Sequence, residues 1–165
     1  SLFRVDRLSW ATGKLLGQSL LMVTGILVGA AGVWVIGFFR MNGFAGLETA
    51  TWLLRLSGRA AVYGFAFLGV NMGLSQLTRS TSGARVLSLL ALLVLALGGP
   101  ILSAPWLELL GPHIIDAARQ FFPNTHKLSL WQPTLPPRAA AMVMLLALGG
   151  LAFSVGHQVM ARRDA

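Results

Sequence analysis

The sequence predicts an all-α integral membrane protein, a helical bundle of four transmembrane helices with short interfacial or re-entrant helices before the last span. Of its 165 residues, 55% are hydrophobic and only 11% are charged, a balance outside the usual range of soluble domains. Four long apolar runs carry no charge, and each approaches the ~20 residues that cross a ~30 Å hydrocarbon layer as a helix. The runs do not alternate as β-barrel strands do, and in lipid their backbone groups must be satisfied within the segment.

Residues 60–100 form the centre of the predicted bundle. Two apolar runs are joined there by a short polar link, residues 78–85, which contains Arg79 and Arg85 among several hydroxyl side chains. A link this short makes the two helices antiparallel neighbours with their joined ends on one side of the membrane. The sequence therefore predicts a membrane hairpin.

We expect a single transmembrane domain over residues 1–165, with spans at about residues 15–39, 59–78, 86–103 and 139–161. An amphipathic interfacial segment is expected up to Lys14, and a short interfacial helix is expected to run from Leu47 into the second span. Gly98-Gly99-Pro100 should end or bend the third span, since proline removes a backbone donor.

Residues 104–138 are predicted to form a non-cytoplasmic loop with interfacial helices. An amphipathic piece, residues 106–122, is broken at Gly111-Pro112, and a proline-rich extended tail is expected from Pro123 onward. Glycines recur four apart, as in Gly13/Gly17 and Gly25/Gly29, which favours close helix packing without identifying the partner helix.

The basic residues favour one orientation. Four spans place both termini and the link at residues 78–85 on the same side, where seven basic residues lie in short segments, and the positive-inside rule makes that side cytoplasmic. The net charge of +8 is therefore assigned to helix anchoring, and no nucleic-acid partner is expected.

Residues for catalysis are sparse. None of the five acidic residues lies in a span, which argues against a proton-coupled carrier. The chain contains no cysteine and no Walker A, GxSxG or HExxH pattern, and we expect no cofactor or metal site of its own. His113, His126 and Asp116 offer an acid–base or metal role as an alternative, whereas His157 is expected to be a hydrogen-bonded packing residue.

Uncharged polar side chains inside the spans have two interpretations. Gln18, Thr24, Asn71 and Ser75 could line a substrate path, or they could form hydrogen bonds between helices worth about 1 kcal/mol each.

Arg4-Val-Asp-Arg7 is followed by Thr12-Gly13-Lys14-Leu15-Leu16-Gly17. This stretch resembles the passage from a cytoplasmic coupling loop into a span in the ABC-2 type transporter permeases. Residues 68–80, LGVNMGLSQLTRS, resemble a small-residue helix that closes in a T-R-S turn, and Arg162-Arg163-Asp164 resembles the short basic tail after the last span. Residues 106–122 occupy the place of the family's re-entrant helices.

The resemblance implies a permease (transmembrane) subunit in a bacterial cytoplasmic (inner) membrane, multi-pass, with cytoplasmic termini. It implies a dimer with a second permease subunit, identical or different, and an ABC ATPase subunit that binds ATP and Mg and drives export or a transmembrane conformational change. The permease would have no catalytic site. The residues implied in coupling to the ATPase are Arg4, Asp6, Arg7, Lys14, Arg79, Ser80 and Arg85. Because the family has six spans, we expect two more before Ser1.

Two rival functions remain open. The chain could be a small four-helix structural or assembly subunit of a larger membrane complex, without a transport path. It could also be a membrane enzyme that uses His113, His126 and Asp116.

Overall fold

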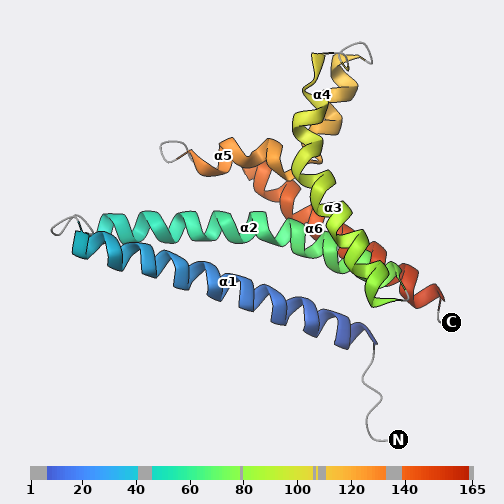
Figure 1. Cartoon of the computed structure of the whole chain (residues 1–165), viewed down its shortest axis with the longest axis horizontal. Coiled ribbons are helices and arrows are strands. Elements are labelled where there is room, and N and C mark those ends of the chain that lie inside the picture. The colour runs from blue at the N-terminus through green and yellow to red at the C-terminus, as the bar shows by residue number, and fades with distance from the viewer. Residues whose placement is uncertain are drawn as a thin grey trace, which may run out of the picture. The chain divides into compact units, whose positions relative to one another are not determined.

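The computed structural model confirms an all-α membrane fold. It describes residues 7–40, 46–78, 80–105, 107, 111–132 and 139–163, and all regular structure in these segments is helical. The elements are α1 (Arg7–Arg40), α2 (Leu47–Leu77), α3 (Thr81–Leu102), α4 (Pro112–Gln120), the 3₁₀ helix η2 (Pro123–His126), α5 (Lys127–Trp131) and α6 (Ala139–Arg163), shown in Figure 1. Among the described residues, α1, α2, α3 and α6 are long and apolar enough to cross a membrane.

The first two long helices extend beyond the predicted spans. Helix α1 begins at Arg7 and continues into the span without a break, so the part of the interfacial segment that the structure describes is continuous with the transmembrane helix. Helix α2 likewise begins at Leu47, and the short interfacial helix expected there is its first turns. Neither segment contains a proline that would end a helix.

The chain divides into two compact units, residues 1–64 and residues 65–165. In the first unit, α1 packs against the first part of α2, where the Met22 sulfur would lie 2.6 Å from a Cβ atom placed on Gly64. A small hollow of about 240 Å³ lies between these helices and is lined by Leu27, Ala30, Ala31, Trp34, Ala50, Leu53, Leu54 and Ser57. Ser57 is buried, and its hydroxyl donates to the Leu53 carbonyl at 2.8 Å.

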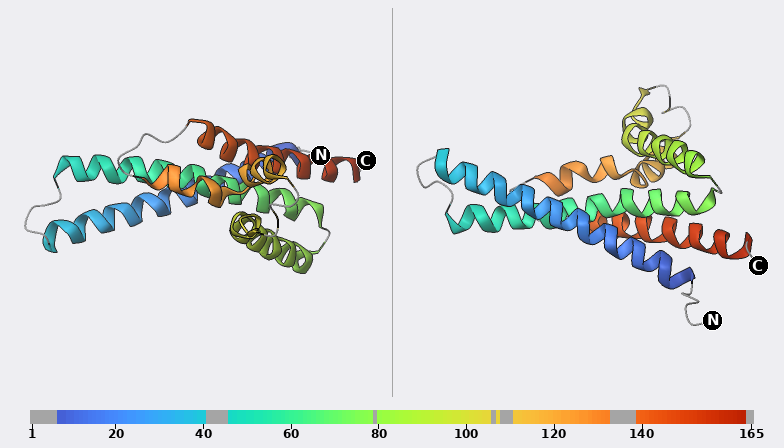
Figure 2. Two further views of the ribbon diagram at one scale, coloured as in Figure 1. Left: turned by 90° about the horizontal axis from the view of Figure 1, so that it is seen from above. Right: turned by 60° about the horizontal axis from the view of Figure 1, so that its bottom comes forward.

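In the second unit, α6 and the later part of α2 pack through glycine. Cβ atoms placed on Gly69 and Gly73 would overlap the backbone of Gly149 and Ala152, and a Cβ on Gly149 would lie 2.7 Å from the Phe65 carbonyl oxygen. Residue numbers rise together along this contact, so the two helices run in the same direction. Figure 2 shows them side by side from two further directions. This is the close approach that small residues four apart permit in lipid.

The turn between α2 and α3 has a specific helix start. Ser80 is the N-cap of α3, with an extended backbone conformation, and its Oγ accepts a hydrogen bond from the Gly83 N–H at 3.1 Å. This bond satisfies one of the free N–H groups at the start of a helix.

The third span ends close to the predicted place. Helix α3 continues through Pro100 and ends at Leu102, with Ser103 as its C-cap. After it, Gly111 has a φ of 98°, a backbone angle that glycine adopts without strain. Helix α4 begins at the next residue, Pro112.

The expectation of an extended tail from Pro123 is wrong over residues 123–131, because Pro123 begins η2, which leads directly into α5. Proline fits the first position of a helix, where its missing N–H costs nothing. The remaining prolines of that tail, at positions 133, 136 and 137, lie outside the described residues.

We call residues 112–131, which comprise α4, η2 and α5, the cap. It packs against the Pro100 end of α3, where both α4 and η2 contact that helix, as Figure 1 shows for α4.

Candidate functional site: an apolar groove between α2 and α6

An apolar groove lies beside the glycine contact of α2 and α6. Its volume is about 410 Å³. Its lining comes from α2, from α6 and from the end of α4, and consists of Val70, Gly73, Leu74, Leu77, Gln120, Phe121, Met144, Ala147, Leu148, Leu151, Ala152, Val155 and Gly156. Gly73 and Gly156, whose backbones are in contact with the opposite helix, are among the lining residues, and most of the others are larger apolar side chains.

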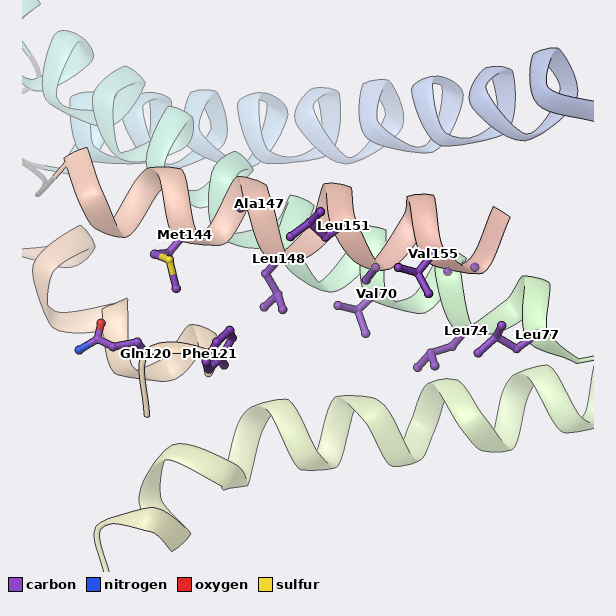
Figure 3. A pocket seen from close by; sticks show the side chains of 13 residues that line it. Val70, Leu74, Leu77, Gln120, Phe121, Met144, Ala147, Leu148, Leu151 and Val155 are labelled. Atoms are coloured by element: carbon purple, nitrogen blue, oxygen red, sulfur yellow. The ribbon is translucent and has the colours of Figure 1, made fainter. Parts of the chain in front are cut away.

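Figure 3 shows how the walls are arranged. Val70, Leu74 and Leu77 lie along the α2 wall, and Met144, Leu148, Leu151 and Val155 lie along the α6 wall. Gln120 and Phe121 lie at one end, opposite Leu77. Among the described residues that line the groove, only Gln120 has a polar side chain. Chemically, the groove suits a hydrocarbon chain or another apolar group, with one amide at its end.

Asn71 and Ser75, two of the four polar residues predicted for a substrate path, lie on α2, the helix that forms one side of the groove. Neither Asn71 nor Ser75 lines the groove. The Ser75 hydroxyl donates to the Met72 carbonyl of its own helix at 2.8 Å, and the Asn71 side-chain oxygen is buried without a hydrogen-bond partner in the described part of the chain. Gln18 and Thr24 are exposed on α1. Within residues 65–165, the structure therefore does not place Asn71 or Ser75 in the lining of the groove.

The residues predicted to couple to an ATPase fall into two groups. Arg4, Asp6 and Arg79 lie outside the described residues, and Arg7 is described only as the first residue of α1. Of the others, Ser80 caps α3, Arg85 is exposed on the first turns of α3, and the Lys14 ammonium lies 5.2 Å from the centre of the Trp10 ring. That distance is typical of a cation–π contact.

His157 lies near the end of the α2–α6 contact. Its ring stacks on Phe153, with ring centres 6.4 Å apart, which agrees with the predicted packing role. The predicted hydrogen bond is missing at one atom, since Nδ1 is buried with no partner among the described residues. Gln76, which is 7% exposed, has an unpaired side-chain oxygen at the corresponding end of α2, again within the described part of the chain.

The three residues of the enzyme alternative have separate surroundings. His113 is exposed, Asp116 pairs with Arg119 at 3.0 Å, and His126 is buried with its Nε2 2.8 Å from the Gln120 carbonyl oxygen. Within the described ranges, no three His, Cys, Asp or Glu side chains form a group that could hold a metal ion.

Two parts of the site were missed by sequence reasoning. The groove walls are leucine and valine side chains, which look in sequence like ordinary lipid-facing residues. Gln120 and Phe121 belong to the loop before the last span, and only the folding of the cap brings them to the groove. A sequence signal did exist for the cap contact, because Pro100 leaves the carbonyl of Ala96 without its helical donor.

Comparison with known proteins gives one match. The family model described as "ABC-2 family transporter protein" matches residues 5–157. No curated protein and no solved structure gives a significant match to the chain.

Proposed function

The chain belongs to the ABC-2 family of transporter proteins, and we propose that it is the permease subunit of an ABC-2 type transporter whose conformation is driven by a separate ATPase subunit. The match over residues 5–157 is the observation that carries this proposal. The multi-pass helical fold with four apolar helices supports it. ATP and Mg would be bound by the ATPase subunit, and a second permease subunit, identical or different, would complete the transporter.

The turn before α3 is the contact we propose for the ATPase. Ser80 fixes the start of α3 through its bond to Gly83, so a force applied to the turn acts on the helix directly. The exposed Arg85 and the neighbouring Arg79 could pair with acidic groups on the ATPase, because complementary charges set orientation and association rate. Lys14, Arg7, Arg4 and Asp6 would form a second contact at the entry to α1.

We further propose that the groove is the path of a hydrophobic or amphipathic substrate. Its lining is apolar apart from the Gln120 amide at one end, so away from that end it would accept an apolar group without leaving a polar group unpaired. The direction we propose is export from a bacterial cytoplasmic membrane, with both termini in the cytoplasm, as the distribution of basic residues favours.

Co-purification tests the coupling contact. The variant Arg79→Ser/Arg85→Ser keeps Ser80 and Gly83, and therefore keeps the hydrogen bond at the start of α3 while removing both charges. We expect the wild-type chain to hold an ATPase subunit in mild detergent and this variant to lose it.

A matched control replaces two basic residues at the end of α6, Arg162→Ser/Arg163→Ser, and should retain the ATPase. Retention of the ATPase by the Arg79/Arg85 variant would contradict the proposed contact. Purification of the wild-type chain with other membrane proteins and no ATPase would favour the assembly-subunit alternative.

A further inference from the structure

Pro100 leaves one carbonyl of α3 without its normal partner. Proline has no backbone N–H, so the residue four positions earlier, Ala96, receives no helical hydrogen bond from position 100. An unpaired carbonyl in a membrane span is costly, because lipid offers it no donor. In the structure, the side-chain amide of Asn124 in the cap donates to the Ala96 carbonyl oxygen.

A second bond joins the cap to the end of the same helix. The Arg119 guanidinium donates to the Leu102 carbonyl twice, from Nη2 at 2.8 Å and from Nε at 3.3 Å. Leu102 is the last residue of α3, where carbonyl groups lack intrahelical donors. A cation there also interacts favourably with the helix dipole.

The shapes of the two surfaces match around these bonds. The ring of Phe122 lies where a Cβ atom on Gly98 would be, and Thr125 Oγ1 would lie 3.3 Å from a Cβ on Gly99. Both glycines are buried. The cap therefore packs directly on the backbone of α3 over the two residues before Pro100.

The cap also has internal bonds that join these contacts to the groove. Thr125 Oγ1 donates to the Arg119 carbonyl at 2.8 Å, and His126 Nε2 lies 2.8 Å from the Gln120 carbonyl oxygen. Gln120 and Phe121, the next residues after Arg119, line the end of the groove (Figure 3). Arg119, which bonds to α3, is thus directly followed by the two residues that line the end of the groove.

We propose that Asn124 and Arg119 are positioning residues, which hold the cap against the end of α3 through hydrogen bonds to the Ala96 and Leu102 carbonyls. They thereby hold Gln120 and Phe121 at the end of the α2–α6 groove. Displacement of α3 then moves the groove end as well, since the cap follows the helix. The transport consequence rests on the proposed function, whereas the fastening itself does not.

The test measures where the cap lies relative to α6. Ile114 in α4 and Val143 in α6 are exposed, at 69% and 63%, and the sequence has no cysteine, so Ile114→Cys/Val143→Cys accepts two spin labels. Pulsed electron paramagnetic resonance on the full chain in lipid nanodiscs then gives the distribution of label distances. We expect Asn124→Leu, which removes the amide donor, to widen this distribution and to lower Tm by several degrees.

A second substitution separates an effect on the position of the cap from an effect on the thermal stability of the chain. Pro100→Ala returns an N–H to position 100 and so restores the helical partner of the Ala96 carbonyl. In the Asn124→Leu background it should raise Tm back toward the wild-type value, while the label distribution stays wide because the hydrogen bond from the Asn124 amide is still absent.

Adding Arg119→Met to this double variant should widen the distribution of label distances further. The control Ser129→Ala removes a bond inside the cap, to the His126 carbonyl at 2.9 Å, and should leave the distribution narrow.

Each result decides the proposal. A distribution of wild-type width in Asn124→Leu, or in the double variant should the single one fail to fold, would overturn it. It would also be overturned if Pro100→Ala gave no recovery of Tm. Failure of the proposed transport function would appear instead as loss of ATPase binding by the wild-type chain, with the label distances still changing as described.

Discussion

Helix α1 and the α2–α6 pair are both rich in glycine but use it differently. In the α2–α6 pair, the space beside Gly69, Gly73, Gly149 and Gly156 is filled by the backbone of the opposite helix. Beside the glycines of α1, at positions 13, 17, 25, 29, 32 and 37, no atom in the described part of the chain lies within 4 Å of an added Cβ.

The difference shows what a small-residue pattern means. Glycines spaced four residues apart allow two helices to approach closely. The sequence pattern is the same, however, whether or not another helix packs on those glycines. Burial agrees with the contacts: in the described structure, no residue of an 18-residue apolar stretch of α1 is buried, whereas 28% of the residues in such stretches of α2 and α6 are buried. In the described structure, the glycines of the α2–α6 pair therefore lie in a helix contact, whereas those of α1 itself do not.

The largest expected effect comes from filling the α2–α6 contact. Gly69→Leu places a side chain where the Gly149 backbone lies, and because backbone cannot rotate away, we expect a loss of about 3 kcal/mol in the free energy of unfolding. Reversible unfolding of the purified chain in detergent micelles measures it.

Gly150→Leu is the matched control, since no described atom lies within 4 Å of a Cβ at that position although Gly149 is its neighbour. Equal stability losses for the two variants would break the comparison, because the damage would then come from glycine replacement in general.

A smaller effect is expected at the cap. Gly98→Ala directs its methyl group into the ring of Phe122, and a side chain can shift where backbone cannot, so we expect a loss of about 2 kcal/mol. Phe122→Leu in the same chain should recover part of this loss, as a double-mutant cycle of unfolding free energies would show. Gly99→Ala, which meets Thr125 Oγ1 at 3.3 Å, should cost less, and an equal cost would argue against the Phe122 ring as the cause.

The smallest effect, of opposite sign, is expected on α1. Gly25→Ala and Gly29→Ala meet no described atom within 4 Å, and alanine favours helix by about 0.5–1 kcal/mol relative to glycine. Thermal unfolding of the single chain should therefore show equal or slightly higher Tm. A clear fall in Tm would indicate that another helix packs on this face, and the contrast between the two regions would disappear.

Much of the fold was predictable because charge and hydropathy act locally. The charge-free runs identified all four long helices, and Gly111-Pro112 marked the start of α4. The helix ends were less predictable, since α1 and α2 continue past the apolar runs through residues that suit both an interface and a helix. The groove was not predictable, because its leucine and valine walls differ from lipid-facing residues only in what lies opposite them.

The sequence by itself determined that the chain is a multi-pass helical membrane protein, because lipid leaves a long apolar segment few structures other than a helix. It also indicated the ABC-2 family through the order of its segments. Only the tertiary structure decided which glycines are in contact, where the groove lies and which side chains bond to the end of α3. Those depend on residues far apart in the chain, such as Ala96 with Asn124 and Gly73 with Gly156, and a local pattern does not specify which distant groups meet.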